Sequence, residues 1–192
     1  MAAHVYELTS TGKLPVALQE AKSYLKVPSS TTADDDLISR LLEASTRDVE
    51  KYLGRRSIRA NTWTRYLDDF CSRIELRRVP VASITSVDRK VSGVWTAVST
   101  AVYYLKTGSR FYEVLPAPDQ DWPTDQDDGE QVVRVVFVTG VDPAVDMAKT
   151  AILRHVAFMF ENRGDADPAN SELSFTASGA RGLLQRERIQ KV

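Results

Sequence analysis

The sequence predicts an α+β protein, in which a helical layer packs beside a small, mostly antiparallel sheet and an extended C-terminal tail follows. Three observations predict this class. Apolar residues recur at helical spacing before residue 54 and again after residue 142. Between these stretches the chain is rich in Val, Ile, Thr, Tyr and Trp and is broken by turn residues. Beyond residue 164 the apolar residues become too few to form a core.

Two helices are expected near the N-terminus. The first begins near Pro15, because proline fits a first helical turn, and it is stopped by Pro28. The second runs from Asp36 to Leu53, with acidic residues in its first turn and Gly54 as its C-cap. Both helices carry an apolar stripe, so they belong to the core layer.

The middle of the chain is expected to form the sheet. Ser92-Gly93 and the stretch 107–109 have the composition of hairpin turns. Apolar and β-branched residues between these and other turn signals predict six strands, at residues 62–67, 73–76, 83–90, 102–106, 111–115 and 132–139.

A third helix and a tail complete the chain. Asp142 caps the helix, Pro143 takes its first position, and the helix runs to about Asn162. Because apolar residues cover most of its circumference, we expect it to be buried on more than one side. The sequence therefore divides into a domain at residues 1–163 and an extended tail at 164–192.

The tail is the first candidate binding segment. It is locally basic and carries scattered apolar residues, which suits a segment that binds a partner by wrapping around it. Its candidate contact residues are Leu173, Phe175, Arg181, Leu183, Leu184, Arg186, Arg188, Ile189 and Lys191.

The second candidate is an acidic loop from Pro116 to Glu130. It holds three prolines and no Lys or Arg, so we expect an irregular and exposed loop. It either repels polyanions or fits a basic partner, and weak binding of divalent ions is the alternative. Its six acidic residues are Asp119, Asp121, Asp125, Asp127, Asp128 and Glu130.

Composition excludes several classes of protein. A formal net charge of −1 gives no general attraction to phosphate, which argues against a dedicated nucleic-acid binder. The single Cys71 excludes an intrachain disulfide, and no Cys/His pairs have zinc-site spacing. No apolar run has the length of a signal peptide core or a membrane span. We expect a soluble protein made in the cytoplasm, with no membrane partner.

No motif indicates catalysis. The common hydrolase, phosphate-loop and dinucleotide motifs are absent. Asp34, Asp35 and Asp36 are interpreted as a helix start rather than a metal site, because consecutive helical residues point in different directions. His155 has no ligand residue one turn away and is interpreted as a packed or interface histidine. We therefore expect no catalytic residue, cofactor or metal; the enzymatic alternative is a small metal-dependent hydrolase using Asp34, Asp36 and the acidic loop.

The order of several local strings resembles the head-to-tail connector (adaptor) family of long-tailed double-stranded-DNA bacteriophages. The resemblance lies in the order and spacing of the strings over about 150 residues rather than in any one of them. The strings are residues 14–27, 36–38, 49–55, 62–63, 79–87, 122–123, 133–140 and 148–163.

The resemblance implies a structural virion protein and not an enzyme. Such a protein forms a homo-oligomeric ring of about twelve subunits in the neck, through a head-to-tail interface that closes. The ring binds the portal on one side and a stopper or tail-completion protein on the other, and double-stranded DNA passes through it without sequence recognition. In this setting the tail would bind the portal, and the acidic loop would face the channel or a partner ring. Another neck protein, a stopper or a tail terminator, is the alternative.

Overall fold

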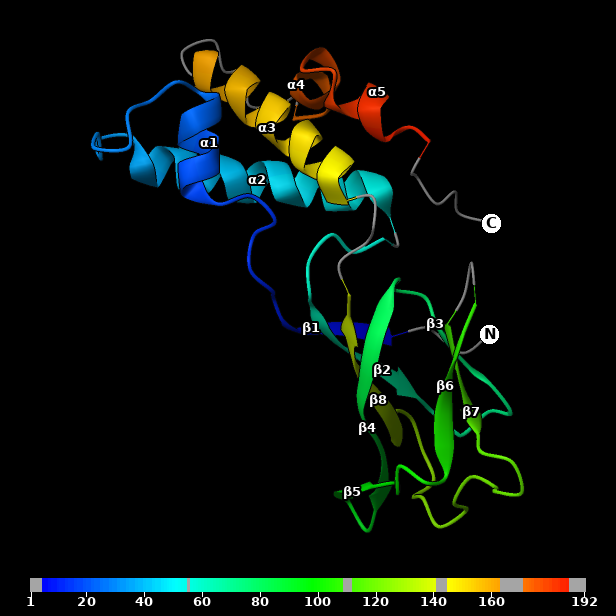
Figure 1. The fold of residues 1–192 in the computed structure, drawn as a ribbon. Coiled ribbons are helices and arrows are strands. Elements are labelled where there is room, and N and C mark those ends of the chain that lie inside the picture. The colour runs from blue at the N-terminus through cyan, green and yellow to red at the C-terminus, as the bar shows by residue number, and fades with distance from the viewer. Residues whose placement is uncertain (1–4, 55, 109–111, 141–144, 163–170, 187–192) are drawn as a thin grey trace. The chain divides into compact units, whose positions relative to one another are not determined.

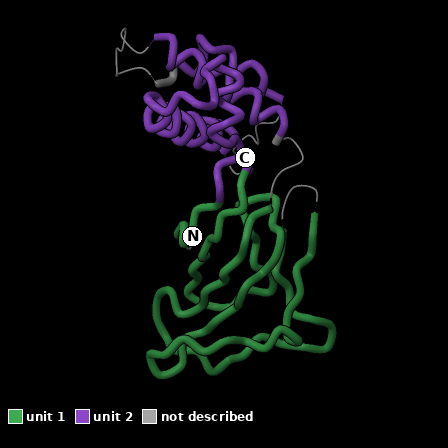
Figure 2. Tube along the Cα trace, turned by 60° about the vertical axis from the view of Figure 1, so that its left-hand side comes forward, with its two compact units in different colours: residues 1–12, 59–141 green, residues 13–58, 142–192 purple. Residues whose placement is uncertain are grey.

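The computed structural model describes residues 5–54, 56–108, 112–140, 145–162 and 171–186. Its contacts divide the chain into two compact units (Figure 2). Unit 1 comprises residues 1–12 and 59–141, and unit 2 comprises residues 13–58 and 142–192. In the described parts of the chain every strand belongs to unit 1 and every helix to unit 2. The predicted α+β class is confirmed.

Unit 1 contains two antiparallel sheets (Figure 1). The larger has the order β1-β2-β8-β4-β5, and the smaller has the order β3-β7-β6. The bounds are β1 Val5–Ser10, β2 Thr62–Leu67, β3 Ile74–Leu76, β4 Val81–Val91, β5 Val94–Ala97, β6 Tyr103–Thr107, β7 Tyr112–Pro116 and β8 Val133–Thr139.

The core of unit 1 is built by alternation along the strands. On β8, Val133, Val135 and Phe137 are fully buried while the residues between them are half-buried. This period of two is the expected pattern for a strand with one face on the core. Ile74 and Val114 of the smaller sheet belong to the same apolar cluster. The two sheets therefore share one core.

The sequence predicted six of these strands but missed β1 and β5. The predicted strand at 62–67 matches β2 in both bounds, and the other five match to within about two residues. β1 is an edge strand that is exposed at nearly every position, so it lacks alternating apolar residues. β5 has only four residues after the Ser92-Gly93 turn. Neither strand carries the periodic signal on which sequence prediction depends.

Unit 2 is a bundle of helices. Its elements are α1 Leu18–Tyr24, α2 Asp35–Leu53, α3 Val145–Glu161, α4 Ser171–Ala177 and α5 Ala180–Leu184. The long helices α2 and α3 pack together, and Ile38, Val49 and Ile152 are fully buried in their common core. The expected C-cap is confirmed, because α2 ends at Gly54 with a positive φ of 74°. The predicted cap at Asp142 and Pro143 lies outside the described residues.

Helix α3 is the centre of unit 2. It packs against α1, α2, α4 and α5, which confirms that it is buried on more than one side. Ala148, Ala151 and Val156 line its buried face. Small residues at two of these positions allow neighbouring helices to approach closely.

The structure differs from the extended tail expected after residue 163. Residues 171–186 contain α4 and α5, and Phe175, Ala180 and Leu184 are buried in the core of unit 2. A chain with few apolar residues can fold in this way because α2 and α3 supply the rest of the apolar surface. Residues 163–170 and 187–192 lie outside the described part.

Candidate partner-binding surfaces

The acidic loop is held in place by its own carboxylates. Asp125 accepts two hydrogen bonds from the guanidinium of Arg89, at 2.6 Å from Nε and 2.8 Å from Nη2. The carboxylate of Asp127 accepts the backbone N–H groups of Ser92 and Gly93, both at 2.7 Å. These contacts tie the loop to strand β4 and to the β4–β5 turn. The loop is irregular, as expected, but it has a defined conformation.

An aromatic stack fixes the middle of the loop. The Trp122 ring lies parallel to Phe70 with their centroids 4.7 Å apart, and it also stacks on Tyr103. Its indole N–H donates to the Cys71 carbonyl at 2.9 Å. Trp122 therefore anchors the loop to the segment after β2.

The Arg89–Asp125 pair also shifts the acid–base equilibria of both groups. The hydrogen bond from Arg89 lowers the pKa of the Asp125 carboxyl, and the same bond raises the pKa of Arg89. Both groups therefore stay charged across the physiological range. The bidentate geometry orients the loop more than it stabilises the fold, because the Asp125 side chain is 57% exposed.

The remaining carboxylates of the loop are exposed. Asp119, Asp121, Asp128 and Glu130 all lie at the surface. Sequence reasoning missed two further acids, Asp68 and Asp69, which follow β2 directly and are also exposed.

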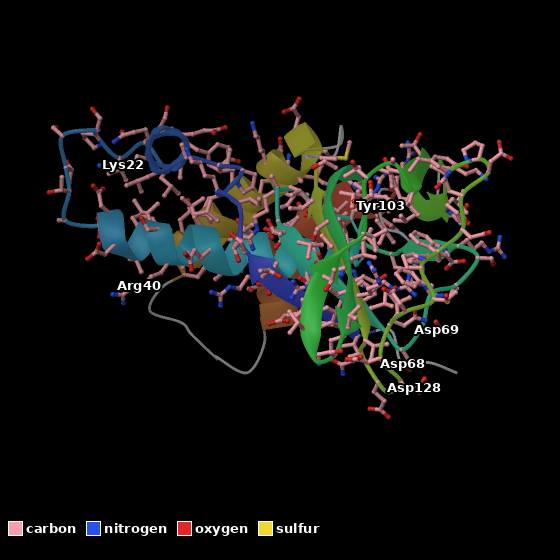
Figure 3. All side chains as sticks on the ribbon, turned by 90° about the horizontal axis from the view of Figure 1, so that it is seen from below. Lys22, Arg40, Asp68, Asp69, Tyr103 and Asp128 are labelled. Carbon is pink, nitrogen blue, oxygen red and sulfur yellow. The ribbon has the colours of Figure 1, made fainter. Side chains whose placement is uncertain are left out.

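Asp68 and Asp69 belong to the same end of unit 1 as the acidic loop. Asp68 accepts the N–H of Gln131, and Asp69 accepts from the side-chain amide of Gln126. Figure 3 shows Asp68, Asp69 and Asp128 close to one another. A pair of acids just after a predicted strand was the signal that could have found this extension.

This acidic end is opposite to the end where the chain passes to unit 2. Strand β2 begins at Thr62, which pairs with Ser10 and Val138, so β1 and β8 finish where β2 starts. The chain passes between the units next to these three positions. Asp68 follows the other end of β2, where Leu67 pairs with Val133. The exposed carboxylates of the acidic loop and of Asp68 and Asp69 therefore lie at this end of unit 1.

The C-terminal candidates fall into three groups. Arg181 and Arg186 are exposed, and Leu183 is half-buried. Phe175 and Leu184 are buried within unit 2, so they are not available to a partner in this conformation. The side chain of Leu173 and all of Arg188, Ile189 and Lys191 lie outside the described residues.

His155 is a packed histidine, as expected, but its surroundings were not predictable from sequence. Its Nε2 is 3.0 Å from Ser174 Oγ, and its Nδ1 is 4.0 Å from Asp48 Oδ2. In space His155 lies between Ser174 and Asp48, as the histidine of a Ser–His–Asp catalytic triad lies between its serine and its aspartate. The 4.0 Å separation exceeds a hydrogen bond, and the His155 side chain is 0% exposed. A catalytic base must reach its substrate, so this arrangement is a tether between helices.

The acidic residues at the start of α2 were interpreted from sequence only as a helix start, but one of them has a side-chain partner. Asp34 occupies the N-cap position without a side-chain capping bond. Asp35 instead forms an ion pair at 2.7 Å with Lys22, whose side chain is 1% exposed. The Lys22 ammonium also donates to the carbonyls of Ser29 and Thr31. Capping alone does not explain these acids, because one of them neutralises a buried lysine.

The described ranges contain neither a metal-binding cluster nor a membrane-spanning helix. No group of three or more His, Cys, Asp or Glu residues there could hold a metal ion. None of the helices described is both long enough and apolar enough to span a membrane.

Three solved structures resemble the chain over nearly its whole length. A chain of the neck of an empty GTA particle, computed with C6 symmetry, has a TM-score of 0.70 at 20% identity, covering 97% of each chain. A chain of the virion of a native gene transfer agent (GTA) particle has a TM-score of 0.70 at 19% identity, covering 98% of this chain and 97% of that one.

The third is a chain of the neck of a native GTA particle computed with C12 symmetry. It has a TM-score of 0.64 at 23% identity, covering 100% of this chain and 97% of that one. At these identities the likeness establishes a shared fold. No family model matches the sequence, and no curated protein matches it.

Proposed function

We propose that this chain is a non-enzymatic structural protein of the neck of a phage-like particle, where copies form a ring that connects the portal to the stopper or tail. The observation that carries the proposal is the full-length fold likeness to neck chains of GTA particles. The order of family-like strings in the sequence supports the same assignment. A ring of about twelve subunits fits the C12 symmetry of one of those necks.

The two candidate surfaces suit the two tasks of such a ring. The exposed carboxylates at the far end of unit 1 repel DNA that passes along a channel, or fit a basic surface of a partner ring. The exposed Arg181 and Arg186 of the C-terminal segment suit an acidic portal surface. Multiple weak contacts around a ring act together, so no single subunit has to bind tightly.

Co-sedimentation with portal-containing capsids tests the proposal. The full chain should pellet with capsids that carry its cognate portal and should stay in solution with capsids that lack one. This result also separates a connector from a stopper, because the family resemblance implies that a stopper binds the connector ring and not the portal. Absence of binding to portal-containing capsids would contradict the connector role.

Charge reversal locates the contact. The double variant Arg181→Glu/Arg186→Glu should bind portals at least about tenfold more weakly, since two attractive charges become repulsive. The matched control is Arg40→Glu/Arg47→Glu, which reverses two exposed arginines of helix α2 in the same unit. Equal binding by both double variants would move the portal contact away from the C-terminal segment.

A further inference from the structure

The two C-terminal helices depend on docking for their structure. Helix α4 has seven residues and α5 has five, and helices this short are unstable alone in water. Phe175, Ala180 and Leu184 bury their side chains against α2 and α3, and the Phe175 ring lies 5.6 Å from that of Tyr52. If the segment left this position, these apolar side chains would be uncovered together.

A polar contact between His155 and Ser174 helps to fasten the segment. His155 of α3 hydrogen-bonds Ser174 of α4 at 3.0 Å, and its ring meets the ring of Phe175 in an edge-on contact at 5.3 Å. A single side chain therefore touches two consecutive residues of α4. The His155 side chain is fully buried, so it stays out of water only while α4 remains docked.

The surroundings of His155 disfavour a positive charge. Among the described residues its buried Nδ1 has no hydrogen-bond partner, and the Asp48 carboxylate is 4.0 Å away. Burial raises the pKa of Asp48, whereas Lys51 lowers it, so the negative charge there is already partly offset.

Two further cations lie near the docked segment, one on α3 itself and one on α5. Arg154 lies beside the α4–α5 turn, 3.7 Å from where a Cβ on Gly179 would stand, and Arg181 of α5 is 6.0 Å from the Tyr52 ring. Desolvation by burial lowers the pKa of His155 to about 4. Docking of α4 and protonation of His155 therefore oppose each other.

We propose that α4 and α5 form a latch, which stays closed while the His155 ring is neutral and opens when the ring is protonated, uncovering Phe175 and Leu184. The device deepens the proposed function, on which its biological role rests: it keeps the apolar anchors of the C-terminal segment covered until the subunit meets its partner. Contact with the portal would then have to open the same latch.

The pH dependence follows from linkage. A histidine whose pKa is about 4 when docked and 6.5 when exposed favours the open state as pH falls below 6.5. The opening constant scales as (1 + 10^(6.5−pH))/(1 + 10^(4−pH)), which rises about twentyfold between pH 7 and pH 5. Above pH 6.5 the latch has its full stability.

Amide hydrogen exchange on the isolated full chain tests the latch. Between pH 7 and pH 5, after correction for intrinsic exchange, the amides of α4 and α5 should open about twentyfold more often while those of the α2 centre change little. Equal protection of α4 and α5 at both pH values would overturn the proposal. Parallel loss of protection in all of unit 2 would overturn it too, because that is global unfolding.

Two variants and one internal reference sharpen the test. His155→Gln keeps a side chain that can hydrogen-bond Ser174 but cannot titrate, so the pH effect on α4 and α5 should vanish. Ser174→Ala should raise opening at every pH while leaving the pH effect in place, and it serves if the glutamine variant does not fold. The chain has two histidines, so the NMR titration of His155 can be compared with that of His4 directly.

The outcomes separate this proposal from the function on which it rests. If α4 and α5 open with falling pH but the chain does not bind portal-containing capsids, the latch stands and the connector role fails. If the chain binds portals while protection of α4 and α5 is independent of pH, the connector role stands and the latch is wrong.

Discussion

At the residue scale, two ion pairs of this protein position loops. Lys22 is buried and satisfied by Asp35 and two carbonyls, so it fixes the connection between α1 and α2. Asp125 and Asp127 hold the acidic loop against β4 and its turn. Buried or bidentate ion pairs of this kind give geometry more than net stability. The sequence showed where the acids were but not which cation or amide each would meet.

Removing the partner of the buried lysine should destabilise unit 2. Asp35→Ala leaves the Lys22 ammonium with only carbonyl partners, and we expect a loss of about 2 to 4 kcal/mol in the free energy of unfolding. Asp36→Ala, the exposed neighbour, should change it by less than about 0.5 kcal/mol. Urea denaturation measures both. Equal effects of the two substitutions would show that the ion pair does not hold the α1–α2 connection.

The Asp127 carboxylate should control the order of the β4–β5 turn. Asp127→Ala removes the acceptor of the Ser92 and Gly93 amides, so hydrogen exchange at these two amides should accelerate. Asp128→Ala removes an exposed neighbour and is the matched control. Unchanged exchange in the first variant would mean that another group holds the loop.

At the element scale, the sequence predicted the helices and strands whose buried face gives a periodic pattern of apolar residues. It missed α4 and α5, which form only because they pack against other helices. The apolar stripes of α2 and α3 and the alternation of β8 are visible in the sequence because each has a buried face. Helices α4 and α5 carry only a few apolar residues, and they exist because α3 provides a surface for Phe175 and Leu184. Local sequence cannot show such a surface.

Because α2 packs against α3, shortening a side chain between them should lower the free energy of unfolding by an amount that follows its burial. Ile152 is fully buried, so Ile152→Ala should cost about 2 to 5 kcal/mol. Leu41 is only half-buried at the edge of the same cluster, and Leu41→Ala should cost about 1 to 2 kcal/mol. Denaturant unfolding of both variants checks the order. A larger loss for Leu41→Ala would contradict the arrangement of the bundle.

At the scale of the whole molecule, the described helices belong to one unit and the described strands to the other, and the chain passes between the units more than once. Sequence reasoning placed a boundary at residue 163, because composition changes there. The units are instead built from segments distant in sequence, such as β1 with β2 and α2 with α3. Long-range pairing of this kind leaves no mark in local composition.

The proposed channel position of the acidic end predicts an effect on DNA passage. Asp119, Asp121, Asp128 and Glu130 should be neutralised together, while Asp125 and Asp127 are kept because they hold the loop. DNA ejection from particles carrying this variant should be slower at low salt, and the difference should shrink as salt screens charges within about 8 to 10 Å. Glu43→Gln, an exposed acid of α2, is the control. Equal ejection rates at low salt would remove the loop from the channel.

The most direct test of the central claim is an electron microscopic reconstruction of portal-containing particles with this chain bound. The neck-protein account predicts a closed ring of about twelve copies against the portal, with the C-terminal segment at the portal contact and an open channel along the ring axis. Particles whose necks contain no density that fits this fold, or that place it away from the portal, would contradict the claim.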